Sequence, residues 1–145
     1  MEKFFQGMNN EQKNPKAMAP LVLAYIGDAI FEAHIRNYLI TDKELLVNEL
    51  HKRATKYVKA KAQAEIVHGL EDELTEEEWK VVKKGRNQKT ATSPKNSAIT
   101  DYRYATGFEA LIGYLFYKGE TERLTTIMNR GIEIINKKTD TGGSK

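Results

Sequence analysis

The chain has 145 residues, no cysteine and a formal net charge of +3. This is the length of one ordinary domain, and it suffices to bury a hydrophobic core without disulfides. The lack of cysteine excludes disulfide scaffolds, thiolate metal sites and cysteine nucleophiles, and it favours a cytoplasmic location. Residues 1–16 lack the basic start and apolar core of a signal peptide and are polar beyond Phe4 and Phe5, so we expect a loose N-terminal arm over 1–19.

The first half of the chain predicts two long helices. An apolar stretch over 21–39 follows Pro20, and proline is tolerated in the first turn of a helix. Asp42 marks a break. Residues 48–70 then carry apolar side chains at helical spacing, which predicts one continuous second helix.

The second half predicts three further helices separated by a basic loop. Thr75 and Glu78 form a capping-box pattern that starts a short helix ending near Gly85. Residues 85–100 are polar and contain Pro94, which predicts a long loop.

Apolar periodicity returns over 102–117 and 120–136. With no alternating strand pattern, we expect an all-α protein with one domain over 20–137 and a disordered tail over 138–145.

Basic residues are concentrated in two blocks, over 51–63 and 83–103, with acidic residues between them over 65–78. Such blocks can form two neighbouring basic surfaces for a polyanionic partner. Solvated helix and loop faces without a partner explain the same pattern, and charge alone does not separate the two interpretations.

Two isolated carboxylates stand out in otherwise apolar helices, Asp28 and Glu109. A buried carboxylate needs a partner or a cation, because burying it alone costs several kcal/mol. Gly27, Gly107 and Gly113 disfavour a helix interior, which suggests that two backbones approach closely near these acids. Two such helices, if they cross, bring Asp28 and Glu109 together.

Two carboxylates among oxygen ligands suit Mg²⁺, which retains waters for a phosphate substrate and a nucleophile. Glu32 lies one turn after Asp28 on the same helix face. It is either a further acid that contacts the site or a surface residue. The alternative is that each acid is satisfied by a neighbouring arginine, lysine or tyrosine.

Two segments, 25–32 (YIGDAIFE) and 108–113 (FEALIG), resemble the acidic motifs of the ribonuclease III catalytic domain. Residues 84–87 (KGRN), 93–96 (SPKN) and 102–106 (YRYAT) resemble the Mini-ribonuclease III branch, which consists of the catalytic domain alone. The resemblance covers about 20–135, with the motifs in the same order and spacing.

This resemblance implies the ribonuclease III helical fold, a homodimer and cleavage of double-stranded RNA. It further implies that Asp28 and Glu109 bind Mg²⁺ and act catalytically, leaving 5′-phosphate ends. It implies precursor 23S ribosomal RNA as the physiological substrate, leaves open a ribosomal protein as an accessory partner, and implies no membrane association. The apolar residues Leu21, Leu23 and Ile26 exceed the needs of one helix, consistent with a dimer.

The sequence also departs from the longer ribonuclease III enzymes. Those enzymes carry three further acids at the positions of Leu21, Ala24 and Thr106. A non-catalytic double-stranded RNA-binding relative is therefore the main alternative. A hydrolase of small phosphorylated molecules has less support, because the three histidines are scattered and no glycine-rich phosphate loop occurs.

The chain has no appended RNA-binding domain in this resemblance, so the catalytic domain must bind the duplex itself. An A-form duplex is recognised mainly through phosphates, 2′-hydroxyls and shape, which suits basic and amide side chains. We expect RNA contacts from the second helix and the basic loop: Lys52, Arg53, Lys56, Lys59, Arg86, Asn87, Lys89, Lys95 and Asn96.

Overall fold

The computed structural model describes residues 13–41, 44–89 and 97–143, with the backbone alone at Ser97 and over 140–143. The described residues are all-helical, as the sequence predicts, and contain no strand. One 3₁₀ turn and six α-helices follow in chain order: η1 (Pro15–Ala17), α2 (Pro20–Leu39), α3 (Val47–Val58), α4 (Ala60–Leu70), α5 (Glu76–Arg86), α6 (Ser97–Lys118) and α7 (Thr121–Gly143). None of these described helices has the length and hydropathy needed to cross a membrane.

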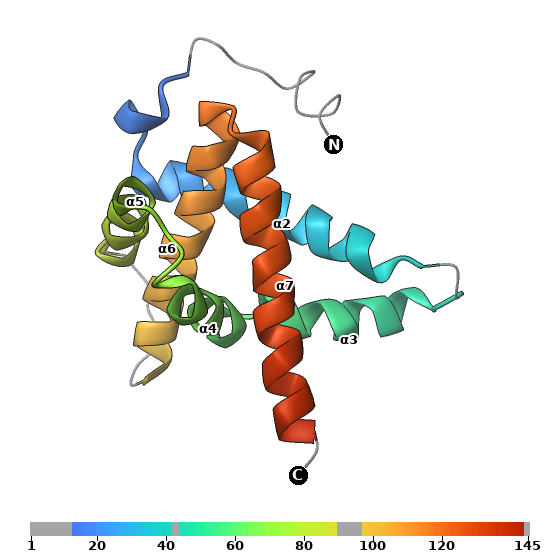
Figure 1. Ribbon diagram of the computed structural model, residues 1–145. Coiled ribbons are helices and arrows are strands. Elements are labelled where there is room, and N and C mark those ends of the chain that lie inside the picture. The colour runs from blue at the N-terminus through green and yellow to red at the C-terminus, as the bar shows by residue number, and fades with distance from the viewer. Residues whose placement is uncertain (1–12, 42–43, 90–96, 144–145) are drawn as a thin grey trace.

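Helix α6 forms the centre of the fold and packs against α2, α4, α5 and α7 (Figure 1). Its middle turns bury Phe108, Leu111, Ile112 and Leu115 almost completely, which explains why its sequence is apolar on nearly every face. Gly119 ends the helix with a φ of 80°, a conformation that only glycine adopts at little cost, and turns the chain toward α7.

Helix α5 begins as the sequence predicts. Thr75 is its N-cap, and the Thr75 hydroxyl accepts a hydrogen bond from the Glu78 backbone at 3.1 Å. The Glu78 carboxylate in turn accepts one from the Thr75 backbone at 2.9 Å, which completes the capping box.

The predicted second helix is wrong in one respect, because it is broken at Lys59 into α3 and α4. Lys59 adopts an extended conformation, with φ −65° and ψ 154°. Neither glycine nor proline marks the break. The buried side chain of Gln63 donates a hydrogen bond to the carbonyl of Val58, the last residue of α3, at 3.0 Å. Helix propensity alone does not reveal this break, because no residue that disfavours a helix stands at it.

Two other boundaries differ from the sequence prediction. Helix α6 starts at Ser97, so the four residues from 97 to 100 are helical rather than part of the basic loop. Helix α7 continues to Gly143, so the backbone of 138–143 is helical where the sequence predicts a disordered tail. No proline interrupts the end of α7, and the first glycines after Asn136 are Gly142 and Gly143.

Candidate active site

Helices α2 and α6 cross with their backbones in direct contact. A Cβ atom added to Gly27 would overlap the backbone carbonyl of Glu109, and one added to Gly113 would overlap the carbonyl of Leu23. These two glycines mark the close approach that the sequence predicts. Gly107 serves another contact, because its Cβ would meet the Val82 carbonyl oxygen of α5 at 2.5 Å.

The crossing brings the Asp28 and Glu109 side chains together, and their carboxyl groups are hydrogen-bonded. We call these two residues the acid pair. Glu109 is half-buried. Burial and the adjacent negative charge of Asp28 raise the pKa of Glu109 to about 8, with a smaller contribution from Glu32. At neutral pH without a cation, the acid pair therefore keeps a proton on Glu109.

Asp28 itself is exposed, so the expectation of two buried carboxylates is wrong for this residue. Its apolar neighbours in the sequence do not enclose it, because Leu21, Val22 and Tyr25 are exposed on the same helix. Glu32 lies one turn further along α2 and is half-buried, and its carboxylate pairs with Arg36 at 3.3 Å.

Gln63 of α4 is a third side chain at the acid pair, and the sequence analysis missed it. Only 1% of its surface is exposed, and its amide hydrogen-bonds to the Glu109 side chain. A glutamine between two buried alanines, Ala62 and Ala64, was the available signal. Its significance was hidden because α3 and α4 were predicted as one amphipathic helix with polar faces.

The described residues place no third acid or histidine close enough to the acid pair to complete a metal-binding cluster. At the positions where longer ribonuclease III enzymes carry acids, Ala24 and Thr106 are buried. The Thr106 hydroxyl donates within its own helix, to the Tyr102 carbonyl at 3.0 Å. The remaining donors are carboxylate and amide oxygens, which fit a hard divalent cation that retains several waters.

The three histidines are occupied elsewhere or exposed. His34 Nε2 lies 2.8 Å from Asn129 Oδ1, and His68 Nδ1 lies 3.2 Å from the Glu71 carboxylate. His51 is exposed on α3. This arrangement gives no histidine a place beside the acid pair.

The basic residues of α3 are not equivalent. Lys52, Arg53 and Lys59 are exposed. Lys56 is half-buried, and its ammonium lies 3.3 Å from the Asn136 side chain and 5.1 Å from the centre of the Tyr57 ring. Lys56 thus contacts α7 and is the least available of the four for RNA.

At the other basic block, Arg86 is half-buried over the ring of Tyr104, 5.6 Å from its centre. Its Nε donates to the Asn87 side chain at 3.1 Å, and no carboxylate pairs with it among the described residues. Lys89 is exposed. The predicted contacts Lys95 and Asn96 lie outside the described residues.

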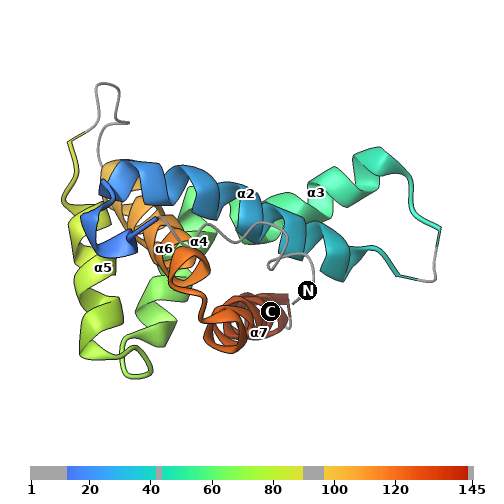
Figure 2. The same cartoon turned by 90° about the horizontal axis from the view of Figure 1, so that it is seen from above.

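The parts of the two basic blocks that lie on α3 and α5 do not form neighbouring surfaces within one chain. Helix α5 and helix α3 lie at opposite ends of the molecule in both views (Figures 1 and 2). Helix α2 runs between them, and its 20 residues span about 30 Å. Asp28, near the middle of α2, therefore lies between the two blocks.

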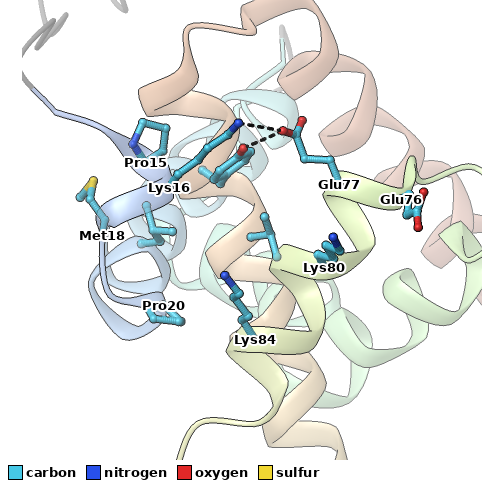
Figure 3. Close-up of a pocket in the computed structure, with 11 residues that line it drawn as sticks. Pro15, Lys16, Met18, Pro20, Glu76, Glu77, Lys80 and Lys84 are labelled. Carbon is cyan, nitrogen blue, oxygen red and sulfur yellow. Dashed lines mark hydrogen bonds and ion pairs between the residues drawn. The ribbon is translucent and has the colours of Figure 1, made fainter.

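A pocket of about 510 Å³ opens beside the first turn of α2, lined by η1, α2, α5 and α6. Figure 3 shows Lys16 reaching toward Glu77, which also accepts a hydrogen bond from Tyr114 at 3.1 Å. Lys80 and Lys84 border the same pocket. Neither member of the acid pair lines it, so the pocket is separate from the candidate active site.

Comparison with known proteins agrees with this geometry. The ribonuclease III domain family matches residues 21–120, which include both helices of the acid pair. Mini-ribonuclease 3 of Clostridium tetani is 47% identical over 144 residues, covering 99% of this chain and 95% of the relative. The chain belongs to the Mini-ribonuclease III branch of the ribonuclease III family.

Other relatives extend the same agreement. Mini-ribonuclease 3 of a Thermoanaerobacter species is 47% identical over 142 residues, covering 94% of this chain and all of the relative. A crystal structure of a protein from Fusobacterium nucleatum superposes with a TM-score of 0.72 at 32% identity, covering 81% of this chain and 93% of that chain. These proteins are therefore similar to this chain over nearly their whole length.

Membership of the Mini-ribonuclease III branch makes the chain an endoribonuclease of the hydrolase class. The ribonuclease III family acts on double-stranded RNA and is generally dimeric. It is also generally dependent on a divalent metal, which agrees with the donor atoms around the acid pair.

Proposed function

We propose that the chain hydrolyses double-stranded RNA with Mg²⁺ held by Asp28 and Glu109. The observation that carries the proposal is the acid pair itself. Two carboxyl groups are held together by crossing backbones, and Glu109 retains a proton because of its burial and because Asp28 beside it is charged. A divalent cation relieves this repulsion, because both groups can then be ionised.

Each residue has a definite task in this proposal. Asp28 is exposed, so it would hold the cation from the solvent side. Glu109 would release its proton to solvent and supply the second carboxylate. When bound, Mg²⁺ activates a water and stabilises the charge that develops on the scissile phosphate. The expected products carry 5′-phosphate ends.

The RNA duplex is proposed to contact the two basic blocks, one on each side of the acid pair. On α3 the exposed Lys52, Arg53 and Lys59 are the main candidates, and Lys56 has a lesser role. At the end of α5, Arg86 offers a guanidinium without a carboxylate partner among the described residues, held over Tyr104. Such contacts bind phosphates without reading base sequence.

The remaining candidates around the basic loop are Asn87, Lys89, Lys95 and Asn96. That Glu32 contacts the metal site as a further acid stays a prediction. Resemblance to Mini-ribonuclease III supports precursor 23S ribosomal RNA as the substrate, with a ribosomal protein as an accessory partner and a cytoplasmic location. The matched range 21–120 falls within the predicted catalytic domain 20–137.

We propose a homodimer that uses the exposed face of α2. Tyr25 is 82% exposed and Val22 is 52% exposed, next to the partly exposed Leu21. Large apolar side chains gathered in this way are typical of interaction surfaces. Of the residues that suggested a dimer from sequence, Leu23 is buried and Ile26 is half-buried within the chain's own core.

Cleavage of a long random-sequence RNA duplex tests the catalytic proposal. Wild-type protein should cut the duplex with Mg²⁺ and not with EDTA, and Asp28→Asn and Glu109→Gln should each abolish cutting. Glu133→Gln is the matched control, because Glu133 is an exposed glutamate on α7, far from the acid pair, and it should cut normally. End-labelling of the cleavage products will show whether their 5′ ends carry a phosphate.

Each outcome has a different meaning. Duplex binding without cleavage by the wild type would support the non-catalytic RNA-binding relative. Cleavage that survives both acid-pair substitutions would refute the assignment of Asp28 and Glu109. Normal cutting by Glu32→Gln would remove Glu32 from the site.

A further inference from the structure

Gln63 is a buried polar side chain that joins three helices at the acid pair. It lies in the first turns of α4, and 1% of its surface is exposed. Placing an unpaired amide in an apolar environment is unfavourable, because the amide loses its hydrogen bonds to water. The partners of Gln63 must therefore account for its presence in the core.

The break at Lys59 creates the first partner. Helix α3 ends at Val58, and the last carbonyls of a helix lack partners from their own helix. Gln63 Nε2 donates to the Val58 carbonyl at 3.0 Å. The side chain thus closes the gap between α3 and α4.

The second partner is the Glu109 side chain of α6, to which the Gln63 amide hydrogen-bonds. The Val58 carbonyl is an acceptor, so it requires the NH₂ group of the amide to face it. Turning the amide over would set two oxygens against each other. The hydrogen-bond partners therefore determine which atom of the amide is the nitrogen and which is the oxygen.

In this orientation the amide oxygen of Gln63 remains unpaired within the described part of the chain. Gln63 Oε1 is buried and has no hydrogen-bond partner among the described residues. Nearly all buried polar atoms are paired, so an exception calls for a water or an ion. Because Oε1 and Nε2 belong to one amide group, this free acceptor lies close to the Glu109 carboxyl group.

We propose that Gln63 is a positioning residue, which holds Glu109 in the orientation that binds the cation and whose Oε1 accepts a hydrogen bond from a water at the site. The inference rests on the proposed metal-dependent function. Groups that hydrogen-bond to metal ligands fix the orientation of those ligands, and their loss commonly lowers metal affinity by about 10- to 100-fold. Waters around a cation are hydrogen-bond donors, so an acceptor is the complementary group.

The experiment measures Mg²⁺ binding to RNA-free protein by isothermal titration calorimetry. Gln63→Met keeps the length of the side chain and removes both amide donors and the acceptor. We expect its dissociation constant for Mg²⁺ to rise by about tenfold or more relative to the wild type. In cleavage assays, a higher Mg²⁺ concentration should restore the rate of Gln63→Met but not that of Asp28→Asn.

Ile66→Ala is the matched control for a general loss of stability. Ile66 is fully buried on the same helix, and its side chain faces Gly131 of α7 rather than the acid pair. This substitution should lower the melting temperature while changing the Mg²⁺ dissociation constant by less than about twofold, since distant sites act independently.

The outcomes separate this inference from the proposed function. If the wild type binds no Mg²⁺, both fail. If the wild type binds Mg²⁺ and Gln63→Met binds it equally well, only the role of Gln63 is overturned. If Gln63→Met does not fold, Gln63→Asn replaces it, because the shorter amide is drawn back from Glu109. An unchanged affinity in a folded Gln63→Asn would likewise overturn the role.

Discussion

Replacing Arg123 by methionine should destabilise the protein by about 3 kcal/mol, because the substitution leaves a buried carboxylate unpaired. Arg123 of α7 donates from Nε and from Nη2 to the two carboxylate oxygens of Glu78, at 2.8 Å each. Its Nη2 also donates to the Glu73 carbonyl at 2.8 Å. These bonds join α7 to the first turn of α5.

The magnitude follows from burial. Glu78 is 3% exposed, and removing one partner of a buried ion pair costs about 3–5 kcal/mol. The Arg123 side chain is 31% exposed, so water can partly replace it, and we expect the lower end of that range. For a domain of this size, the melting temperature should fall by roughly 10 °C.

Arg130→Met is the matched control on the same helix. Arg130 makes an equally good pair with Glu73, through donor distances of 2.8 and 2.7 Å. The Glu73 side chain is 40% exposed, however, and exposed pairs contribute about 0–1 kcal/mol. Urea unfolding followed by circular dichroism should separate the two variants clearly. Equal losses of stability in both would refute the reasoning from burial.

The pH dependence gives a second check on Arg123. Burial raises the pKa of Glu78, but hydrogen bonds from Arg123 and from the Thr75 backbone outweigh it and hold the pKa below its usual value. A lowered pKa adds stability above the unfolded-state pKa, and this stability is lost as the pH falls through the folded-state pKa. The difference between wild type and Arg123→Met should therefore narrow below about pH 4.

Three further predictions concern the acid pair and the dimer. In EDTA, the free energy of unfolding should fall as the pH rises from about 5 to 8, because folded Glu109 keeps its proton up to a pKa of about 8 while the unfolded chain has released it. Glu109→Gln should remove this pH dependence and, in urea titrations, be more stable than the wild type at pH 8 by about 4 kcal/mol. A wild-type slope of zero would contradict this. Gly27→Ala should prevent the crossing of α2 and α6 and abolish cleavage, whereas Gly69→Ala, which meets only the Ile134 side chain, should keep both activity and fold, as measured by duplex cleavage and circular dichroism. Tyr25→Arg should weaken a homodimer by about 30-fold or more in analytical ultracentrifugation, since it removes a large anchor. Ile40→Arg, at the C-terminal end of α2, should leave the dimer affinity unchanged. If both substitutions weaken the dimer equally, the interface lies elsewhere.

Local signals explain the parts of the fold that the sequence predicted well. The capping box at Thr75 and Glu78 involves residues three apart, and both of its hydrogen bonds form in the structure. Gly27 and Gly113 also predicted the helix crossing correctly, because interior glycines occur in a helix where another backbone must come close. These two residues made the meeting of Asp28 and Glu109 predictable.

The errors arose where the sequence carried no local signal for the observed structure. The break at Lys59 has no glycine or proline, and Gln63 looked like one polar residue on an amphipathic helix. The exposure of Asp28 was misjudged because the apolar residues beside it face outward instead of forming a core. Both cases depend on which helix packs against which face.

The amino-acid sequence by itself determined the all-helical class, the residues of the acid pair and the family to which the chain belongs. Periodicity, caps and motifs are short-range properties, so they can be read along the chain. Only the tertiary structure decided that Gln63 reaches Glu109, and that the basic residues of α3 and of α5 lie at opposite ends of the molecule. The crossing of helices sets these distances, since packing brings residues from separate helices together in ways that local spacing does not encode.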